Sequence, residues 1–188
     1  MPAVLILLAA LGAADGATQA IRARDAEIRA ALPPPGSEIT AAVRKRIETI
    51  VTRAIDVRAM VQASLGGRWQ QMSASQRRRL VTAFENRFRR TSSSELDSYR
   101  STRIDYQPEV EPGDGTVQVP TRLVVKGEPT DITYTMKREK DGWHIIDITV
   151  DSVSTVANYR SSFARIITKE GVEGLIKRLE RGGSPTKS

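Results

Sequence analysis

The stretch from Trp143 to Phe163 constrains the fold more than any other, because it begins with the repeat of a strand and ends with the repeat of a helix. Three apolar residues alternate first, as a half-buried strand requires: Ile146, Ile148 and Val150. Three more follow at helical spacing: Val153, Val156 and Phe163. Asp151 and Ser152 separate the two runs and suit a helix N-cap. A strand that leads directly into a helix predicts a corner where sheet and helix share one apolar interior.

Apolar residues recur at helical spacing on both sides of a central run of strands. This spacing predicts helices over 18–32, 37–54 and 56–65, a long helix that begins at a capping box over 73–76, and a last helix over 170–179. On the long helix, Leu80, Phe84 and Phe88 lie four residues apart and form an apolar stripe. Such a stripe usually belongs to a core, but ligand cavities are built from the same helix faces.

The apolar repeat changes to two after Tyr99. It predicts about four antiparallel strands, around 104–106, 117–125, 132–136 and 143–150, with no crossover helix between them. The pair Asp141-Gly142 between two alternating runs indicates a hairpin. Helices, then strands, then helices again are typical of an α+β fold. We expect the helices to pack on a curved antiparallel sheet and to enclose a cone-shaped interior.

The amino-acid composition argues against several kinds of functional site. The 188 residues contain no cysteine and one histidine, His144, so we expect no metal and no cofactor. Lys and Arg outnumber Asp and Glu by 17 to 9 over residues 1–103, but number 12 against 13 over the rest. A basic surface in the first half would suit anionic lipid headgroups or an acidic protein partner. Nucleic acid is less favoured, because no aromatic residues are interleaved with the arginine clusters.

Residues 1–17 have the apolar run and small residues of a secretory signal peptide, although no Lys or Arg precedes the run. The run is too short to span a bilayer comfortably, and no later stretch is apolar enough to do so. A cysteine-free chain also fits the periplasm, where thiols are oxidised. The sequence therefore predicts export to the periplasm, one α+β domain over 18–181 and a frayed tail over 182–188.

Two carboxylates near the corner, those of Asp147 and Asp151, would suit proton abstraction in an isomerase-like enzyme. Asp147 falls on the strand face opposite the alternating isoleucines, so we expect it to point away from a cavity that they line. His144 has no second histidine, cysteine or nucleophile elbow to work with. We therefore expect a carrier of apolar ligands rather than an enzyme. An adaptor that binds an acidic partner or nucleic acid through the arginines of 77–90 is a third, weaker hypothesis.

The residues of the corner resemble those of a known family. The run from Val150 to Ser154, followed by the run from Val156 to Phe163, is similar to the hallmark of the periplasmic phospholipid-binding proteins of the Mla-type pathway, also called the toluene-tolerance auxiliary family. The similarity extends in order over 56–179 and includes these residues: Asp56, Met60, Leu65, Gly66, Trp69, Phe84, Gly142, Trp143, Asp147, Gly171, Gly174, Leu175 and Ile176. The chain departs from the family pattern at Val57, where an aromatic residue is usual, and in the uncharged start of its signal.

The resemblance implies a fold related to nuclear transport factor 2, extended by helices, with a deep apolar pocket for phospholipid tails. It also implies a soluble, monomeric shuttle between an outer-membrane lipoprotein complex and an inner-membrane ABC transporter complex, which together maintain lipid asymmetry. Some relatives are associated with hopanoid production, so a hopanoid or sterol-like cargo is the alternative to phospholipid.

On this interpretation we expect the lipid tails to contact apolar residues of helices and sheet: Met60, Leu65, Trp69, Leu80, Phe84, Phe88, Val119, Leu123, Val125, Ile132, Tyr134, Met136, Ile146, Ile148, Val150, Val153, Val156 and Phe163. We expect three polar residues to form a rim around the headgroup: Asn158, Tyr159 and Arg160. Arg160 would donate charged hydrogen bonds to phosphate. The alternative is that Arg160 pairs with a carboxylate such as Asp151 and that Tyr159 only packs.

Overall fold

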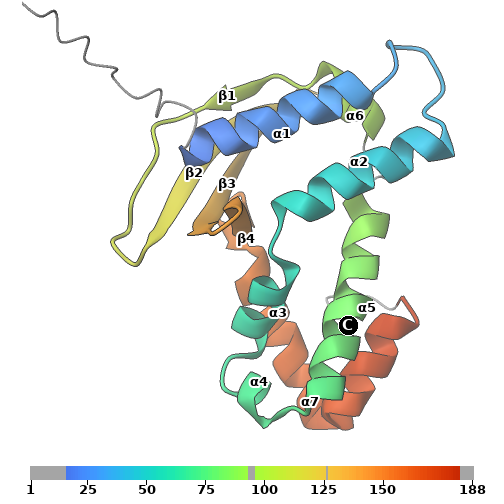
Figure 1. Ribbon diagram of the computed structural model, residues 1–188, viewed down its shortest axis with the longest axis vertical. Coiled ribbons are helices and arrows are strands. Elements are labelled where there is room, and N and C mark those ends of the chain that lie inside the picture. The colour runs from blue at the N-terminus through green and yellow to red at the C-terminus, as the bar shows by residue number, and fades with distance from the viewer. Residues whose placement is uncertain (1–15, 93–95, 126, 183–188) are drawn as a thin grey trace, which may run out of the picture.

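The computed structural model describes residues 16–92, 96–125 and 127–182, and it shows helices packed against one antiparallel sheet (Figure 1). The elements follow in this order: α1 (Ala17–Ala31), α2 (Ala41–Ala54), α3 (Val57–Leu65), α4 (Arg68–Gln71), α5 (Ala74–Ser92), α6 (Leu96–Ser101), β1 (Ile104–Tyr106), β2 (Thr116–Val125), β3 (Glu128–Glu139), β4 (Gly142–Val150), β5 (Val153–Ser154) and α7 (Thr155–Glu180). The predicted α+β class is confirmed. Most of the predicted signal peptide, residues 1–15, lies outside the described residues, whereas Gly16 and Ala17 begin α1.

The sheet is open, with five strands in the order β1-β2-β3-β4-β5 and every neighbouring pair antiparallel. The strand count exceeds the predicted one because Val153 and Ser154, which the helical repeat assigns to the following helix, form the short edge strand β5. The turn between β4 and β5 holds Asp151 and Ser152 at φ values of 45° and 68°. The N-cap of α7 is therefore Ser154, which accepts a hydrogen bond from the Ala157 amide at 3.0 Å, and not Asp151 or Ser152 as the sequence predicted.

A β-bulge in β4 changes which isoleucines face the interior. Met136 of β3 pairs with Ile145 and Thr135 pairs with Asp147, so the register passes over Ile146. Ile145 is consequently 5% exposed, while Ile146 is only half-buried. The sequence predicted that Ile146, Ile148 and Val150 share the inner face, and the structure differs at Ile146 because one extra residue reverses the alternation.

The helices form two groups around the sheet (Figure 1). Helix α1 crosses one face of the sheet, and α2 runs beside it. Helices α3, α5 and α7 pack together at the other end of the molecule, with the short α4 next to them. Helix α7 is interrupted at Gly171, whose φ of 69° and ψ of 178° suit only glycine, and its second half turns back beside α5.

The main core joins the second helix group to the sheet and also includes Ala17 and Ile21 of α1 and Ala54 of α2. Its largest fully buried side chains include Met60, Leu80, Phe84, Met136 and Phe163. Leu80 and Phe84 of the apolar stripe of α5 therefore belong to the core, whereas Phe88 is partly buried beside it. The capping box that opens α5 is also present, because Ser73 and Gln76 exchange hydrogen bonds of 3.0 and 3.1 Å. Within the described residues, no helix is long and apolar enough to cross a membrane.

Candidate binding cavity

A cavity of about 230 Å³ lies between the sheet, α1 and α2, and most of its wall is apolar. Aliphatic side chains come from both helices, from the α2–α3 linker and from the sheet: Ile21, Ile28, Val51, Ala54, Ile55, Ile104, Ile145 and Ile148. Aromatic side chains complete the wall: Phe88, Tyr99, Tyr106 and Tyr134. The cavity lies between the helix layer and the sheet, so the packing of these two layers determines its position.

The bulge in β4 and the α2–α3 linker build one side of this cavity. Ile145 and Ile148 are three residues apart, yet both line it, because the bulge between them restores the same facing direction. Ile55 forms a parallel bridge with Ile145, and the Asp56 amide donates a 2.9 Å hydrogen bond to the Ile145 carbonyl. This bridge fixes the end of α2 against the sheet and brings Ile55 into the wall.

A cluster of hydrogen-bonded polar side chains lies in the cavity wall next to α6 and β1. The Asp25 carboxylate accepts a hydrogen bond from the Tyr99 hydroxyl and bonds of 2.9 and 3.0 Å from Arg29 Nε. Arg29 in turn donates to the Thr102 carbonyl at 2.8 Å. Burial and the bond to Asp25 raise the pKa of Tyr99, and burial raises the pKa of Tyr134 to about 12. These phenols are therefore neutral hydrogen-bond donors at physiological pH.

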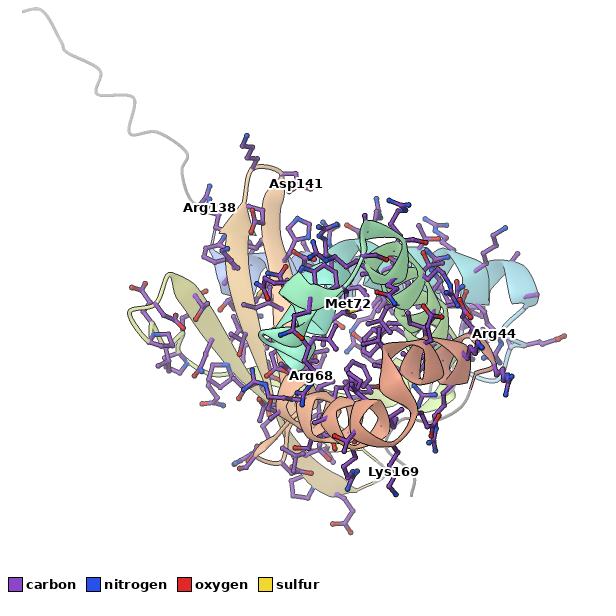
Figure 2. All side chains as sticks on the ribbon, turned by 90° about the horizontal axis from the view of Figure 1, so that it is seen from below. Arg44, Arg68, Met72, Arg138, Asp141 and Lys169 are labelled. Carbon is purple, nitrogen blue, oxygen red and sulfur yellow. The ribbon has the colours of Figure 1, made fainter. Side chains whose placement is uncertain are left out.

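A polar groove of about 680 Å³ adjoins the cavity, since both are lined by Arg24 and Ile55. The groove runs to the turn between β3 and β4, where Asp141 lies at the free end of the hairpin (Figure 2). Arg24 and Arg53 share one partner there, because both bond to Glu27, at 2.5 and 3.1 Å. His144 also lines the groove and lies 3.0 Å from Asp141. The groove thus offers charged groups of both signs next to an apolar interior.

The structure places the predicted tail-contacting residues in three environments. Phe88, Tyr134 and Ile148 line the cavity. Most of the others are packed in the core instead: Met60, Leu65, Trp69, Leu80, Phe84, Val119, Met136, Val156 and Phe163. Leu123 is buried, Ile132 and Ile146 are half-buried, and Val150 and Val153 are exposed. The side chain of Val125 lies outside the described part of the chain. Contact of these residues with lipid stays a prediction.

The predicted rim residues lie on the first turns of α7, and none of them is among the described residues that line the cavity. Asn158 is exposed. Tyr159 packs edge-on against Phe84, with ring centroids 4.7 Å apart, and also contacts Phe163. Arg160 donates to the Ala63 carbonyl at 3.0 and 3.3 Å, so its guanidinium joins α7 to α3. This geometry favours a packing role for Tyr159, and it gives Arg160 a backbone carbonyl rather than Asp151 as its partner.

Asp147 organises the corner between β4 and α7. Its carboxylate accepts hydrogen bonds from the Ile148 amide at 2.8 Å, the Val156 amide at 3.0 Å and the Ser154 hydroxyl. All its partners belong to the chain segment that turns from strand to helix, which is the pattern of a structural cap. Among the described residues, no group of three His, Cys, Asp or Glu side chains is placed to hold a metal ion.

Several residues of the wall were missed by the sequence analysis: Ile21, Ile28, Val51 and Tyr106. The apolar repeat identifies the inner face of 18–32 and 37–54, but it does not say whether that face meets another side chain or a void. Ile145 was missed because a bulge leaves no trace in a period-two pattern except two adjacent isoleucines.

Comparison with known proteins agrees with this architecture. The structure described above is an antiparallel sheet covered by helices, with an apolar cavity between them. The model of the MlaC protein family matches residues 27–181. The chain therefore belongs to the MlaC family, as the resemblance at the β4–α7 corner predicted. A solved structure, the phospholipid-binding protein from Ralstonia solanacearum in complex with a phospholipid, has a TM-score of 0.74 at 22% sequence identity. The likeness covers 87% of this chain and 94% of that one, and it shows a shared fold. A search of curated protein sequences finds no match.

Replacing Asp147 by Asn tests the structural role of its carboxylate. The amide of Asn has one acceptor oxygen and no charge, so we expect the free energy of unfolding to fall by about 1.5–3 kcal/mol. Urea denaturation followed by circular dichroism measures this change. Asp105→Asn is the matched control, because Asp105 forms an exposed pair with Arg103 and its loss should cost at most about 0.5 kcal/mol. Equal stability of the two variants would contradict the assignment.

Proposed function

We propose that this protein is a non-enzymatic carrier that holds the acyl chains of a phospholipid in the cavity between α1, α2 and the sheet. The observation that carries the proposal is the apolar cavity itself, which no side chain of the described residues fills and which a polar groove adjoins. Membership of the MlaC family and the phospholipid bound to the Ralstonia relative support it. We further propose that it acts in the periplasm as a monomeric shuttle between outer- and inner-membrane complexes, and membership of the MlaC family supports the transport role.

The energetics explain why a carrier must enclose both tails. Burying a methylene is worth about 0.8 kcal/mol, so two chains with roughly 30 methylenes would cost about 24 kcal/mol to leave in water. That figure exceeds the stability of a typical domain, about 5–15 kcal/mol. A carrier that left one chain exposed would therefore bind the membrane rather than leave it.

The cavity has to open before two chains enter. A methylene occupies about as much space as a water molecule, about 30 Å³, so roughly 30 methylenes need about 900 Å³. The cavity measures about 230 Å³. We infer that α1 moves away from the sheet on loading, because it forms the wall opposite the strands, whereas the Ile55–Ile145 bridge holds the end of α2 at the sheet.

The adjoining groove is suited to the headgroup. Arg24 belongs to both cavity and groove, and Arg53 lies beside it on the shared partner Glu27. The phosphodiester of a phospholipid has two non-bridging oxygens that could replace the Glu27 carboxylate as partner of both guanidinium groups. This assignment competes with the rim expected at Asn158, Tyr159 and Arg160, and experiment can separate the two.

Lipid extraction tests the proposal directly. The protein is produced in a bacterial periplasm and purified without detergent, and its organic extract is identified and quantified by mass spectrometry. We expect diacyl phospholipid at a constant ratio to protein. A polycyclic lipid in its place would assign the cargo to the hopanoid class. An extract without any lipid would contradict the proposed function.

Filling the cavity should block loading. Ile148→Trp places a bulky ring where the tails would lie, and because overpacking costs about 1–3 kcal/mol we expect lipid content to fall about tenfold. Thr149→Trp is the matched control: Thr149 is the next residue on the same strand, and it lines a groove on the outer face of the sheet. Lipid content per protein, measured as above, should change only in the first variant. Equal lipid content in both variants would place the tails elsewhere.

Charge reversal should identify the headgroup site. We expect Arg24→Glu combined with Arg53→Glu to lower the affinity for phosphatidylglycerol about three- to tenfold, with a smaller effect at high salt, because these exposed charges are screened. Arg160→Glu is the comparison, and we expect it to alter stability more than affinity since Arg160 bonds to the Ala63 carbonyl. Transfer of fluorescent phosphatidylglycerol between vesicles measures the effect. A larger loss of affinity in Arg160→Glu than in the double variant would place the headgroup at α7.

A further inference from the structure

The Tyr106 hydroxyl differs from Asp25 and Tyr99 beside it, which hydrogen-bond to each other. The side chain of Tyr106 lines the wall, and its hydroxyl oxygen is buried without a hydrogen-bond partner in the part of the chain that the structure describes. Leaving a buried hydroxyl unpaired costs a protein about 1–3 kcal/mol, so such a group calls for a reason. Replacing it by a Phe ring would remove this cost without changing the shape of the wall.

The Asp25 carboxylate, whose charge acts on Tyr106, already accepts hydrogen bonds from other residues. Asp25 lies close enough for its charge to raise the pKa of Tyr106, after burial, which is the larger cause. However, one oxygen of the Asp25 carboxylate accepts from both the Tyr99 hydroxyl and Arg29 Nε, and the other also accepts from Arg29. The network that satisfies Tyr99 therefore leaves Tyr106 beside it as a neutral donor.

The ring of Tyr106 is also held in place. It ends the edge strand β1, where it pairs with Thr121 of β2. The Arg22 guanidinium lies 4.0 Å from the centroid of the ring, within cation–π range. A side chain fixed by a strand on one side and a stacked arginine on the other is pre-organised, so it loses little entropy when it binds a ligand.

We propose that the Tyr106 hydroxyl donates a hydrogen bond to an oxygen atom of the bound lipid, within the otherwise apolar cavity. The acceptor is an ester carbonyl if the cargo is a diacyl phospholipid, or a hydroxyl oxygen if it is polycyclic. This inference rests on the proposed lipid-binding function and deepens it. It makes Tyr106 a determinant of specificity, because a site with an unpaired donor discriminates against a ligand that lacks the acceptor.

The test compares lipids that differ only in the acceptor. Delipidated wild-type protein and Tyr106→Phe are titrated with a diester phosphatidylcholine and with its diether analogue of the same headgroup and chain length, in competition with a fluorescent phospholipid. A single neutral hydrogen bond is worth roughly three- to tenfold in affinity. We expect wild type to prefer the diester lipid by that factor and Tyr106→Phe to lose the preference through weaker diester binding alone. Cholesterol is titrated in parallel, and a loss confined to cholesterol would assign the acceptor to a hydroxyl.

Tyr159→Phe is the matched control, because Tyr159 packs against Phe84 and Phe163 and does not line the cavity. It should keep the preference of the wild type. Without lipid, Tyr106→Phe should melt at the same temperature as wild type or higher, since it removes a buried unpaired group. An equal loss for diester and diether lipids, or an unchanged preference in Tyr106→Phe, would overturn the inference and leave the carrier function standing. A wild-type protein that binds none of these lipids would overturn both.

Discussion

The backbone bridge between Ile55 and Ile145 is the contact on which the rest of the site depends. It joins the end of α2 to the sheet through the Asp56 amide and the Ile145 carbonyl, just where β4 is bulged. Asp56 also caps α3 by accepting a hydrogen bond from the Ala59 amide at 2.8 Å. One short linker therefore sets the direction of both helices relative to the sheet. The cavity exists because α2 is held at this edge while α1 crosses the open face beyond it.

Polar groups around the cavity divide according to how they are satisfied. Asp25, Tyr99 and Arg29 satisfy one another and hold α1 to α6, so they give the wall a fixed polar patch at no cost in unpaired groups. Arg24 and Arg53 share Glu27 near solvent, where a competing anion can displace the carboxylate with little penalty. The Tyr106 hydroxyl is buried and has no hydrogen-bond partner in the described part of the chain. In the proposed function, structural support, headgroup binding and ligand recognition thus fall to different side chains.

Local patterns in the sequence were sufficient for the fold class, and insufficient for the cavity. The capping box at Ser73, the hairpin near Asp141 and the alternation along β2 and β3 each depend on neighbours within a few residues, so they could be predicted. The N-cap of α7 was placed too early because Asp151 and Ser152 adopt positive φ, which their side chains permit but do not require. The cavity depends on where α1 and α2 stop relative to a bulged strand, and no local pattern records a distance between two elements. The family resemblance supplied the ligand class, while packing decided that Phe84 and Phe163 belong to the core.

The small volume of the cavity has a thermodynamic consequence for a protein that must both take up and give up its cargo. A permanent void large enough for two acyl chains would cost the empty protein on the order of 10 kcal/mol or more, which is comparable to its whole stability. The proposed closure of the empty cavity to about 230 Å³ would avoid most of that cost. The energy recovered on closing is then subtracted from the affinity for lipid. An empty state that relaxes in this way makes release easier. The same closure stabilises the unloaded protein and keeps its affinity for lipid low enough for the lipid to dissociate.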